Sequence, residues 1–160
     1  MVFVTVGSQK FPFDRLLRAV DECVANGFIQ EEVFAQTGMC RYSPQNYNCT
    51  SFLDRDEFAQ KMDAADIVVT HGGTGAIVGA LKRGKHVIAM ARLAQLGEHV
   101  DDHQVQLLKE FECAGLICTC KDTPTLIEAY HSTLLREPVI YRSTNTEFLD
   151  DLDRYLRSCS

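Results

Sequence analysis

The sequence lacks several features that would place it directly in a class of protein. No apolar run approaches the roughly 18–20 residues that a membrane span needs, and repeats and Pro/Gly/Ser-rich linkers are absent. Basic residues are not in excess, because the formal net charge is −6, which argues against nucleic acid as the main partner. The opening MVFVTVG has no basic segment and no cleavage site, so we expect a first strand there and not a signal peptide. These absences favour one globular domain over residues 1–160.

Motifs of several enzyme classes are also missing. There is no G-x-S-x-G nucleophile elbow, no Walker lysine loop and no paired cysteine nucleophile. Seven cysteines occur without a C-x-x-C pair, which favours free thiols in a reducing cytosol. Cys118 and Cys120 would share one face of a strand, but neither has a histidine or cysteine nearby at the spacing of zinc ligands.

Strand-like and helix-like segments alternate along the chain. This order predicts an α/β fold, a Rossmann-like parallel sheet with helices on both faces. Ligands of such sheets bind at the carboxyl ends of the strands, so the turns after Val6, Thr70 and Ala91 are the places to search. The expected strands are residues 2–6, 33–37, 67–70, 87–91 and 115–119, with a short one around 49–52; the expected helices are 13–25, 54–64, 74–83, 100–111, one from 123 and one from 144 or 145.

The most informative turn is HGGTG, from His71 to Gly75. Its glycines, Gly72, Gly73 and Gly75, allow a tight bend and close approach to a ligand, and the helix that follows offers unpaired N–H groups to a phosphate. His71 would donate a hydrogen bond to the same anion. The alternative is a plain tight connection with a surface histidine. A loose dinucleotide fingerprint that includes Gly79 is weak, because Arg92 stands where an acidic residue would end the next strand.

Two further polar segments follow predicted strands. Gly7-Ser8-Gln9 is a short turn at the same edge of the sheet, and by itself it fits a plain turn equally well. GEHVDDHQ, residues 97–104, contains carboxylate, imidazole and amide groups that suit a hydroxyl-rich ligand such as a sugar. The alternatives for this segment are a solvated helix start and a metal site, since His99 and His103 would share a helix face.

These three segments, in this order, resemble the C-terminal, donor-binding half of a GT-B glycosyltransferase of the family 28 C-terminal-domain type. The matching stretches are VFVTVGSQKFPFDRLLRAV, AADIVVTHGGTGAIVGALKRGKHVIA and EHVDDHQVQLL. The sequence is most similar to the small catalytic subunits of split two-chain glycosyltransferases, among them bacterial capsule and exopolysaccharide enzymes and the eukaryotic pair that adds N-acetylglucosamine to dolichol diphosphate.

The resemblance implies a role for particular residues of this chain. Gly7 and Ser8 would line the donor phosphates, backbone groups of Phe52 and Leu53 would hold the uracil, and His71, Gly72, Gly73, Thr74 and Gly75 would cradle the diphosphate. Asp102, His103 and Gln104 match a stretch that reaches the sugar hydroxyls. Many relatives carry a ribose-binding glutamate eight residues after the histidine. Gly79 stands there in this chain, so Glu98, next to His99, is a candidate for that task.

The function that the resemblance implies is an inverting transfer of a hexose from a UDP-sugar to a lipid-linked saccharide, without metal or cofactor. The catalytic base would lie on a membrane-anchored partner that binds the acceptor and recruits this cytoplasmic chain to the inner face of the membrane. Two alternatives are a non-catalytic nucleotide-sugar-binding subunit and an NADP-dependent oxidoreductase. The sequence does not distinguish glucose, galactose, glucuronic acid and N-acetylglucosamine, and it does not identify the acceptor or the linkage.

Overall fold

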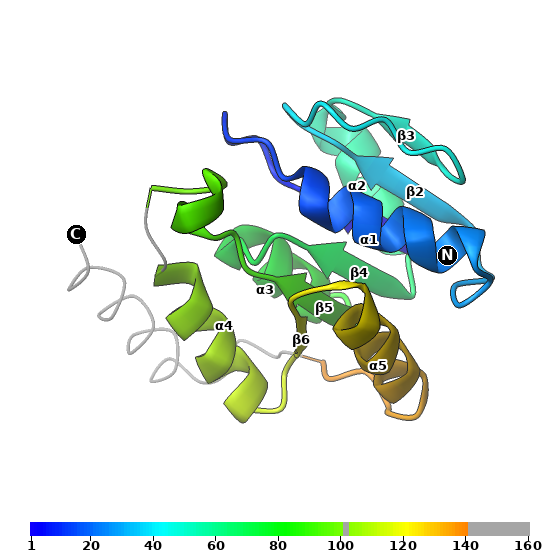
Figure 1. Ribbon diagram of the computed structural model, residues 1–160. Coiled ribbons are helices and arrows are strands. Elements are labelled where there is room, and N and C mark those ends of the chain that lie inside the picture. The colour runs from blue at the N-terminus through cyan, green and yellow to red at the C-terminus, as the bar shows by residue number, and fades with distance from the viewer. Residues whose placement is uncertain (101–102, 141–160) are drawn as a thin grey trace.

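A six-stranded parallel sheet forms the centre of the computed structural model, which describes residues 1–100 and 103–140 (Figure 1). The strand order is β3-β2-β1-β4-β5-β6, and every pair of neighbours is parallel. The strands are β1 (Val2–Thr5), β2 (Val33–Gln36), β3 (Asn48–Thr50), β4 (Ile67–Thr70), β5 (His86–Met90) and β6 (Cys118–Cys120). The predicted α/β, Rossmann-like class is confirmed.

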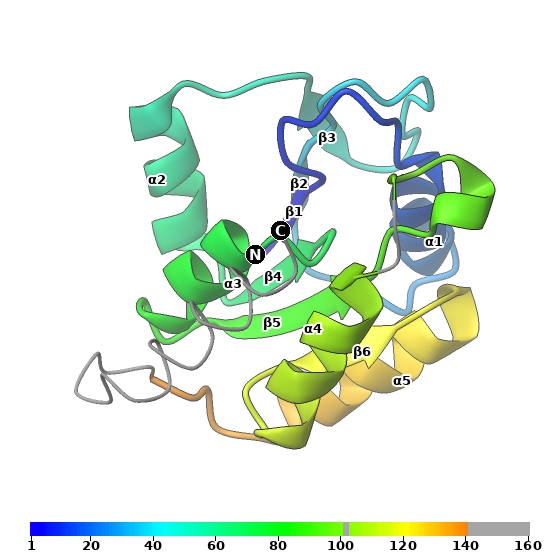
Figure 2. The same ribbon diagram turned by 90° about the vertical axis from the view of Figure 1, so that its left-hand side faces the viewer.

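Helices cover both faces of the sheet, as Figure 2 shows from the side. On one face α1 and α5 share an apolar cluster with Val4 of β1 and Met90 of β5. On the other face α2, α3 and α4 share a second cluster with Phe3 of β1 and Val68 of β4. Strands buried on both faces need continuous apolar runs, which is why the sequence pattern located them. The helices are α1 (Asp14–Ala25), α2 (Arg55–Ala64), α3 (Thr74–Leu81), α4 (His103–Cys113) and α5 (Thr123–Leu134).

Local signals fixed several helix starts. Asp54 caps α2 in a capping box with Glu57: its carboxylate accepts from the N–H groups of Asp56 and Glu57, and its own N–H donates to the Glu57 carboxylate. At α5 the cap is Asp122, and Pro124 is the second residue of the helix.

Two predicted elements begin three residues too early, whereas the other predicted elements that the structure describes begin within one residue of the predicted start. The helix expected from Val100 begins at His103, and it is preceded by a short 3₁₀ turn, Ala94–Leu96, that was not predicted. Val100 is exposed, so its apolar side chain did not mark a helix face. The strand expected over 115–119 is Cys118–Cys120 and pairs with β5 over these three residues only. The helix predicted from 144 or 145 lies outside the described residues.

A buried carboxylate shapes the loop between β2 and β3. Asp21 on α1 accepts hydrogen bonds from the Tyr42 hydroxyl, at 2.5 Å, and from the backbone N–H groups of Gln45 and Asn46, both at 2.9 Å. Burial raises the pKa of Asp21, but these hydrogen bonds stabilise the carboxylate and leave its pKa below the ordinary value. The loop is therefore tied to the first helix by a charge that the sequence pattern did not reveal.

Candidate functional site

The two glycine-containing turns lie side by side at the point where the strand order reverses. Successive strands β1, β2 and β3 extend to one side, and the chain then returns to place β4 on the other side of β1. Thr5 at the end of β1 pairs with Thr70 at the end of β4, so the turns that begin at Val6 and His71 leave the sheet together. This is the topological switch point at which doubly wound folds bind their ligands.

The imidazole of His71 fits between two of the glycines. A Cβ atom on Gly7 would lie 2.7 Å from His71 Cε1, and one on Gly73 would lie 2.5 Å from Nε2. Gly7 also has a φ of +74°, which disfavours any side chain. Gly7 and Gly73 thus provide room for the histidine ring, which the sequence alone did not indicate.

His71 is neutral at pH 7 in this structure. Its Nδ1 lies 3.3 Å from the backbone oxygen of Thr5 and 3.3 Å from the Thr70 hydroxyl. Since a carbonyl oxygen only accepts, we assign the proton to Nδ1, which leaves a lone pair on Nε2. Burial lowers the pKa of His71 to about 4, although the Thr5 hydrogen bond opposes the shift. The predicted donation to an anion through Nε2 therefore requires that the ring first take up a proton.

A cleft of about 520 Å³ opens over these turns, and we call it the switch-point cleft. Six of the predicted binding residues line it: Gly7, Ser8, Leu53, His71, Gly73 and Gly75. Gln9 was noted only as part of the Gly7 turn, and sequence reasoning missed Thr5, Gln36, Asp54, Arg55, Phe58 and Ala76. Thr5 and Gln36 end adjacent parallel strands, and that position was the available signal for them.

The N-terminus of α3 opens into the switch-point cleft. Its N-cap is Gly73, which has no side chain to cap the helix, whereas Asp54 caps α2 on the other wall. The first N–H groups of any helix have no intrahelical partner, and they carry the positive end of its dipole. Gly75 differs from the other two cleft glycines, because a Cβ there would meet nothing within 4 Å. An uncapped helix N-terminus beside the open space at Gly75 provides a place where an anion can come close to backbone N–H groups.

Three predicted residues lie near the cleft without lining it. Gly72 has a φ of +88° and packs against Leu108 of α4. A Cβ atom added to Gly72 would lie 3.0 Å from Leu108 Cδ1. Phe52 is 49% exposed, and Thr74 is the first residue of α3. The backbone N–H of Leu53 donates to Gln36 Oε1 at 3.3 Å, so within this structure that N–H is already bound.

Glu98, the candidate ribose ligand, binds other residues of the protein. It is buried, and its carboxylate accepts from Arg15 Nε at 3.0 Å, Arg15 Nη2 at 2.8 Å and the Leu93 N–H at 3.0 Å. It does not line the switch-point cleft. Each carboxylate oxygen already accepts from the protein, so a ribose hydroxyl would have to compete with these bonds, and the predicted ribose contact of Glu98 stays a prediction.

The remaining predicted residues lie around the start of α4. Gln104 Oε1 accepts the backbone N–H of Arg92 at 3.3 Å, so its amide is held at the end of β5. The His99 ring lies against Phe11, with centroids 6.2 Å apart. His103 begins α4, and Asp102 lies outside the described residues. Their contact with a sugar stays a prediction.

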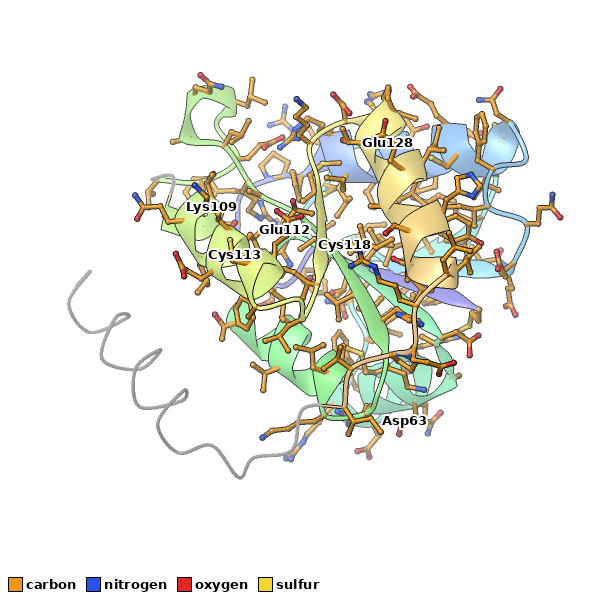
Figure 3. The ribbon with its side chains drawn as sticks, turned by 90° about the horizontal axis from the view of Figure 1, so that it is seen from below. Asp63, Lys109, Glu112, Cys113, Cys118 and Glu128 are labelled. Atoms are coloured by element: carbon orange, nitrogen blue, oxygen red, sulfur yellow. The ribbon has the colours of Figure 1, made fainter. Side chains whose placement is uncertain are left out.

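A second cavity of about 340 Å³ lies between α4, β6 and the start of α5. Lys109 and Glu112 of α4 border it, and Figure 3 shows Glu112 between α4 and β6. Glu112 accepts from the Thr119 N–H at 3.0 Å and from its hydroxyl at 2.6 Å, so the carboxylate joins α4 to β6. Within residues 1–100 and 103–140, no three His, Cys, Asp or Glu side chains gather as a metal site, and no helix has the length and apolar character to cross a membrane.

Comparison with solved structures supports the fold. The NMR solution structure of ALG13 superimposes with a TM-score of 0.60 at 19% identity and covers 92% of each chain. CalG4, the calicheamicin glycosyltransferase, gives a TM-score of 0.58 at 18% identity over 84% of this chain and 34% of its own. MurG of Acinetobacter baumannii gives 0.55 at 17% identity over 83% of this chain and 41% of its own.

Sequence comparison identifies the family. The UDP-N-acetylglucosamine transferase subunit ALG13 of Mus musculus is 29% identical over 133 residues, which are 74% of this chain and 11% of that protein. The subunit of the same name from Candida glabrata is 31% identical over 116 residues, 69% of this chain and 56% of its own length. The chain thus spans a small part of the mammalian relative and just over half of the yeast one. The model of the glycosyltransferase family 28 C-terminal domain matches residues 1–153, and the chain belongs to this family.

Proposed function

We propose that the chain is the donor-binding catalytic subunit of an inverting glycosyltransferase that takes a hexose from a UDP-sugar. One observation carries the proposal: the switch-point cleft joins an uncapped helix N-terminus, the turn at Gly7 and Ser8, and His71. Its volume of about 520 Å³ is within the range of small-molecule sites. The family match and the relatives named as transferase subunits support the same class of reaction.

The chemical task of this subunit is to stabilise the leaving UDP. Negative charge develops on the diphosphate as the bond to the sugar breaks, and N–H groups at the start of α3 are already oriented toward it. Gly75 leaves space for a phosphate to approach them. The added negative charge also favours protonated His71, which then donates from Nε2 to the diphosphate. The proposal requires neither a metal nor a cofactor.

Sugar recognition is proposed for Asp102, His103 and Gln104, and uracil recognition for the backbone near Phe52 and Leu53. Gln36 and Arg55 join the cleft wall beside Leu53 and are further candidates for contact with the nucleotide.

We place the general base on a partner chain. Inversion requires a base that takes the proton of the acceptor hydroxyl, and in the GT-B arrangement the acceptor lies across from the donor half. The partner would be membrane-anchored, would bind a lipid-linked saccharide in capsule or exopolysaccharide synthesis, and would hold this chain at the cytoplasmic face of the membrane. The relatives' description as subunits supports a partner.

Titration by NMR with UDP and with NADPH tests donor binding directly. We expect UDP to shift the resonances of residues 7–8 and 71–76, and NADPH to leave them unchanged. Co-expression with a candidate membrane partner and a transfer assay with radiolabelled UDP-sugars then tests the reaction. NADPH binding in place of UDP would refute the proposal, as would a UDP-binding complex that transfers no sugar from any of the four candidate donors.

A further inference from the structure

Arg92 is a completely buried arginine that the donor site described above does not use. It follows β5, with 0% of its surface exposed, and its guanidinium is held on backbone oxygens. Nη2 donates to Val6 at 2.7 Å, and Nη1 donates to Phe11 at 2.7 Å and to Glu98 at 3.0 Å. Within the part of the chain that the structure describes, Nε has no hydrogen-bond partner. The guanidinium lies 4.9 Å from the centre of the Phe13 ring.

The positive charge of Arg92 is only partly compensated. The nearby carboxylate of Glu98 is bound by Arg15, whose Nη2 lies 2.8 Å from it, while Arg92 binds the Glu98 backbone. Arg92 thus donates to no carboxylate among the described residues, whereas Arg15 binds Glu98 and also interacts electrostatically with Asp122. Burial lowers the pKa of Arg92, yet a guanidinium stays charged in proteins. Burying such a charge is costly unless an anion accompanies it.

The location of this charge relates it to the switch-point cleft. Val6, which accepts from Arg92, directly precedes Gly7, and Gly7 and Ser8 line the cleft. Since the N–H of a trans peptide points opposite to its C=O, the Gly7 N–H faces away from Arg92, toward the Thr5 hydroxyl at 3.3 Å. A hydrogen bond to the carbonyl polarises the same peptide and strengthens its N–H as a donor. Arg92 also binds Gln104 through its backbone N–H.

We propose that Arg92 is a positioning residue for the donor diphosphate: held on three backbone carbonyls behind the Gly7 turn, it fixes that turn and supplies a buried positive charge whose counter-ion is the bound diphosphate. The inference rests on the proposed function. Arg92 does not touch the ligand, so it acts through the turn and through its field, which a low-dielectric interior screens poorly.

The test compares ligands with and without phosphates. UDP and uridine are titrated by NMR into the wild-type protein and into Arg92→Met, Arg92→Lys and Arg18→Met. Arg18→Met removes the same charge from an exposed arginine that stacks on Tyr42, so it controls for net charge. We expect Arg92→Met to lower UDP affinity by about tenfold or more and uridine affinity by less than threefold. Arg92→Lys should restore most of the UDP affinity, and Arg18→Met should change neither.

A second readout does not depend on a nucleotide. Arg92 and His99 both lower the pKa of His71 in addition to burial, so removal of the Arg92 charge should raise that pKa, followed through the His71 ring resonances. Arg92→Gln, which keeps an amide donor for Val6, replaces the methionine variant if the latter does not fold.

The outcomes separate the two proposals. Equal losses of UDP and uridine affinity, or an unchanged His71 pKa in a folded uncharged variant, would show that Arg92 has only a structural role. A wild-type protein that binds neither UDP nor inorganic pyrophosphate would overturn the proposed function and this inference together.

Discussion

The substitution Gly75→Ala tests whether the open space beside Gly75 is used by a ligand, because the protein itself does not fill it. Gly75 is the second residue of α3 and lines the switch-point cleft, and a methyl group there would meet no protein atom within 4 Å. Its φ is not positive, so alanine fits the backbone. Alanine in place of glycine in a helix raises the free energy of unfolding by about 0.5–1 kcal/mol. For a domain of this size we expect a melting temperature about 1–4 °C higher.

The same methyl group should weaken UDP binding. It would project into the space through which we expect a phosphate to approach the N–H groups of α3. Hydrogen bonds to a charged group contribute about 1.5–3 kcal/mol each, so loss of one predicts a roughly 10- to 100-fold higher dissociation constant. Calorimetry with UDP measures this value, and urea denaturation of the free protein measures the change in stability.

Gly79→Ala is the matched control on the same helix. Gly79 does not line the switch-point cleft, and its Cβ would lie 3.9 Å from Arg83 Nη1, an ordinary contact. The control should gain a similar stability and keep the wild-type affinity for UDP. If Gly75→Ala is more stable and binds UDP as the wild type does, then the open space at Gly75 is not where the diphosphate binds. If Gly75→Ala were less stable than the wild type, a methyl group at position 75 would not fit in open space as the structure indicates.

Three further predictions follow from the contacts of single residues. Gly73→Val should lower the free energy of unfolding by about 1–3 kcal/mol in thermal denaturation, because its Cβ would lie 2.5 Å from His71 Nε2; wild-type stability would contradict this. Gln104→Ala should reduce turnover of the complex with its partner by roughly tenfold to a thousandfold while UDP affinity changes less than threefold, and the reverse pattern would remove its role at the sugar. Asp21→Asn should cost about 1–3 kcal/mol at pH 7, since the carboxylate accepts from Tyr42. The folded-state pKa of Asp21 is lowered, so the carboxylate contributes to the free energy of unfolding above its unfolded-state pKa, and this contribution is lost as pH falls. In denaturation series from pH 7 to 3, the free energies of unfolding of wild type and variant should therefore converge. A constant difference between them would refute the assignment.

Local sequence determined the order of the elements and the edge of the sheet at which to look for a site. The apolar runs at β1 and β4 are buried on both faces, and alternation of such runs with helical patterns permits few topologies other than a parallel sheet. The carboxyl ends of parallel strands meet at one edge, so the turns at Gly7 and His71 were expected to lie together, and they do. These features depend on residues close together in the chain, and a single sequence is sufficient to read them.

Only the tertiary structure showed which side chains pack against the glycines of these turns. From the sequence, Gly73 appeared as space for a ligand, but its missing side chain makes room for the His71 ring, while Gly75 faces open space. Glu98 pairs with Arg15, 83 positions away, and Arg92 binds the carbonyl of Val6, 86 positions away. Such pairings follow from how the helices pack on the sheet, and the pattern of neighbouring residues carries no record of them. A single sequence therefore indicates where to look for a ligand site, whereas the packed structure determines which polar groups remain available there.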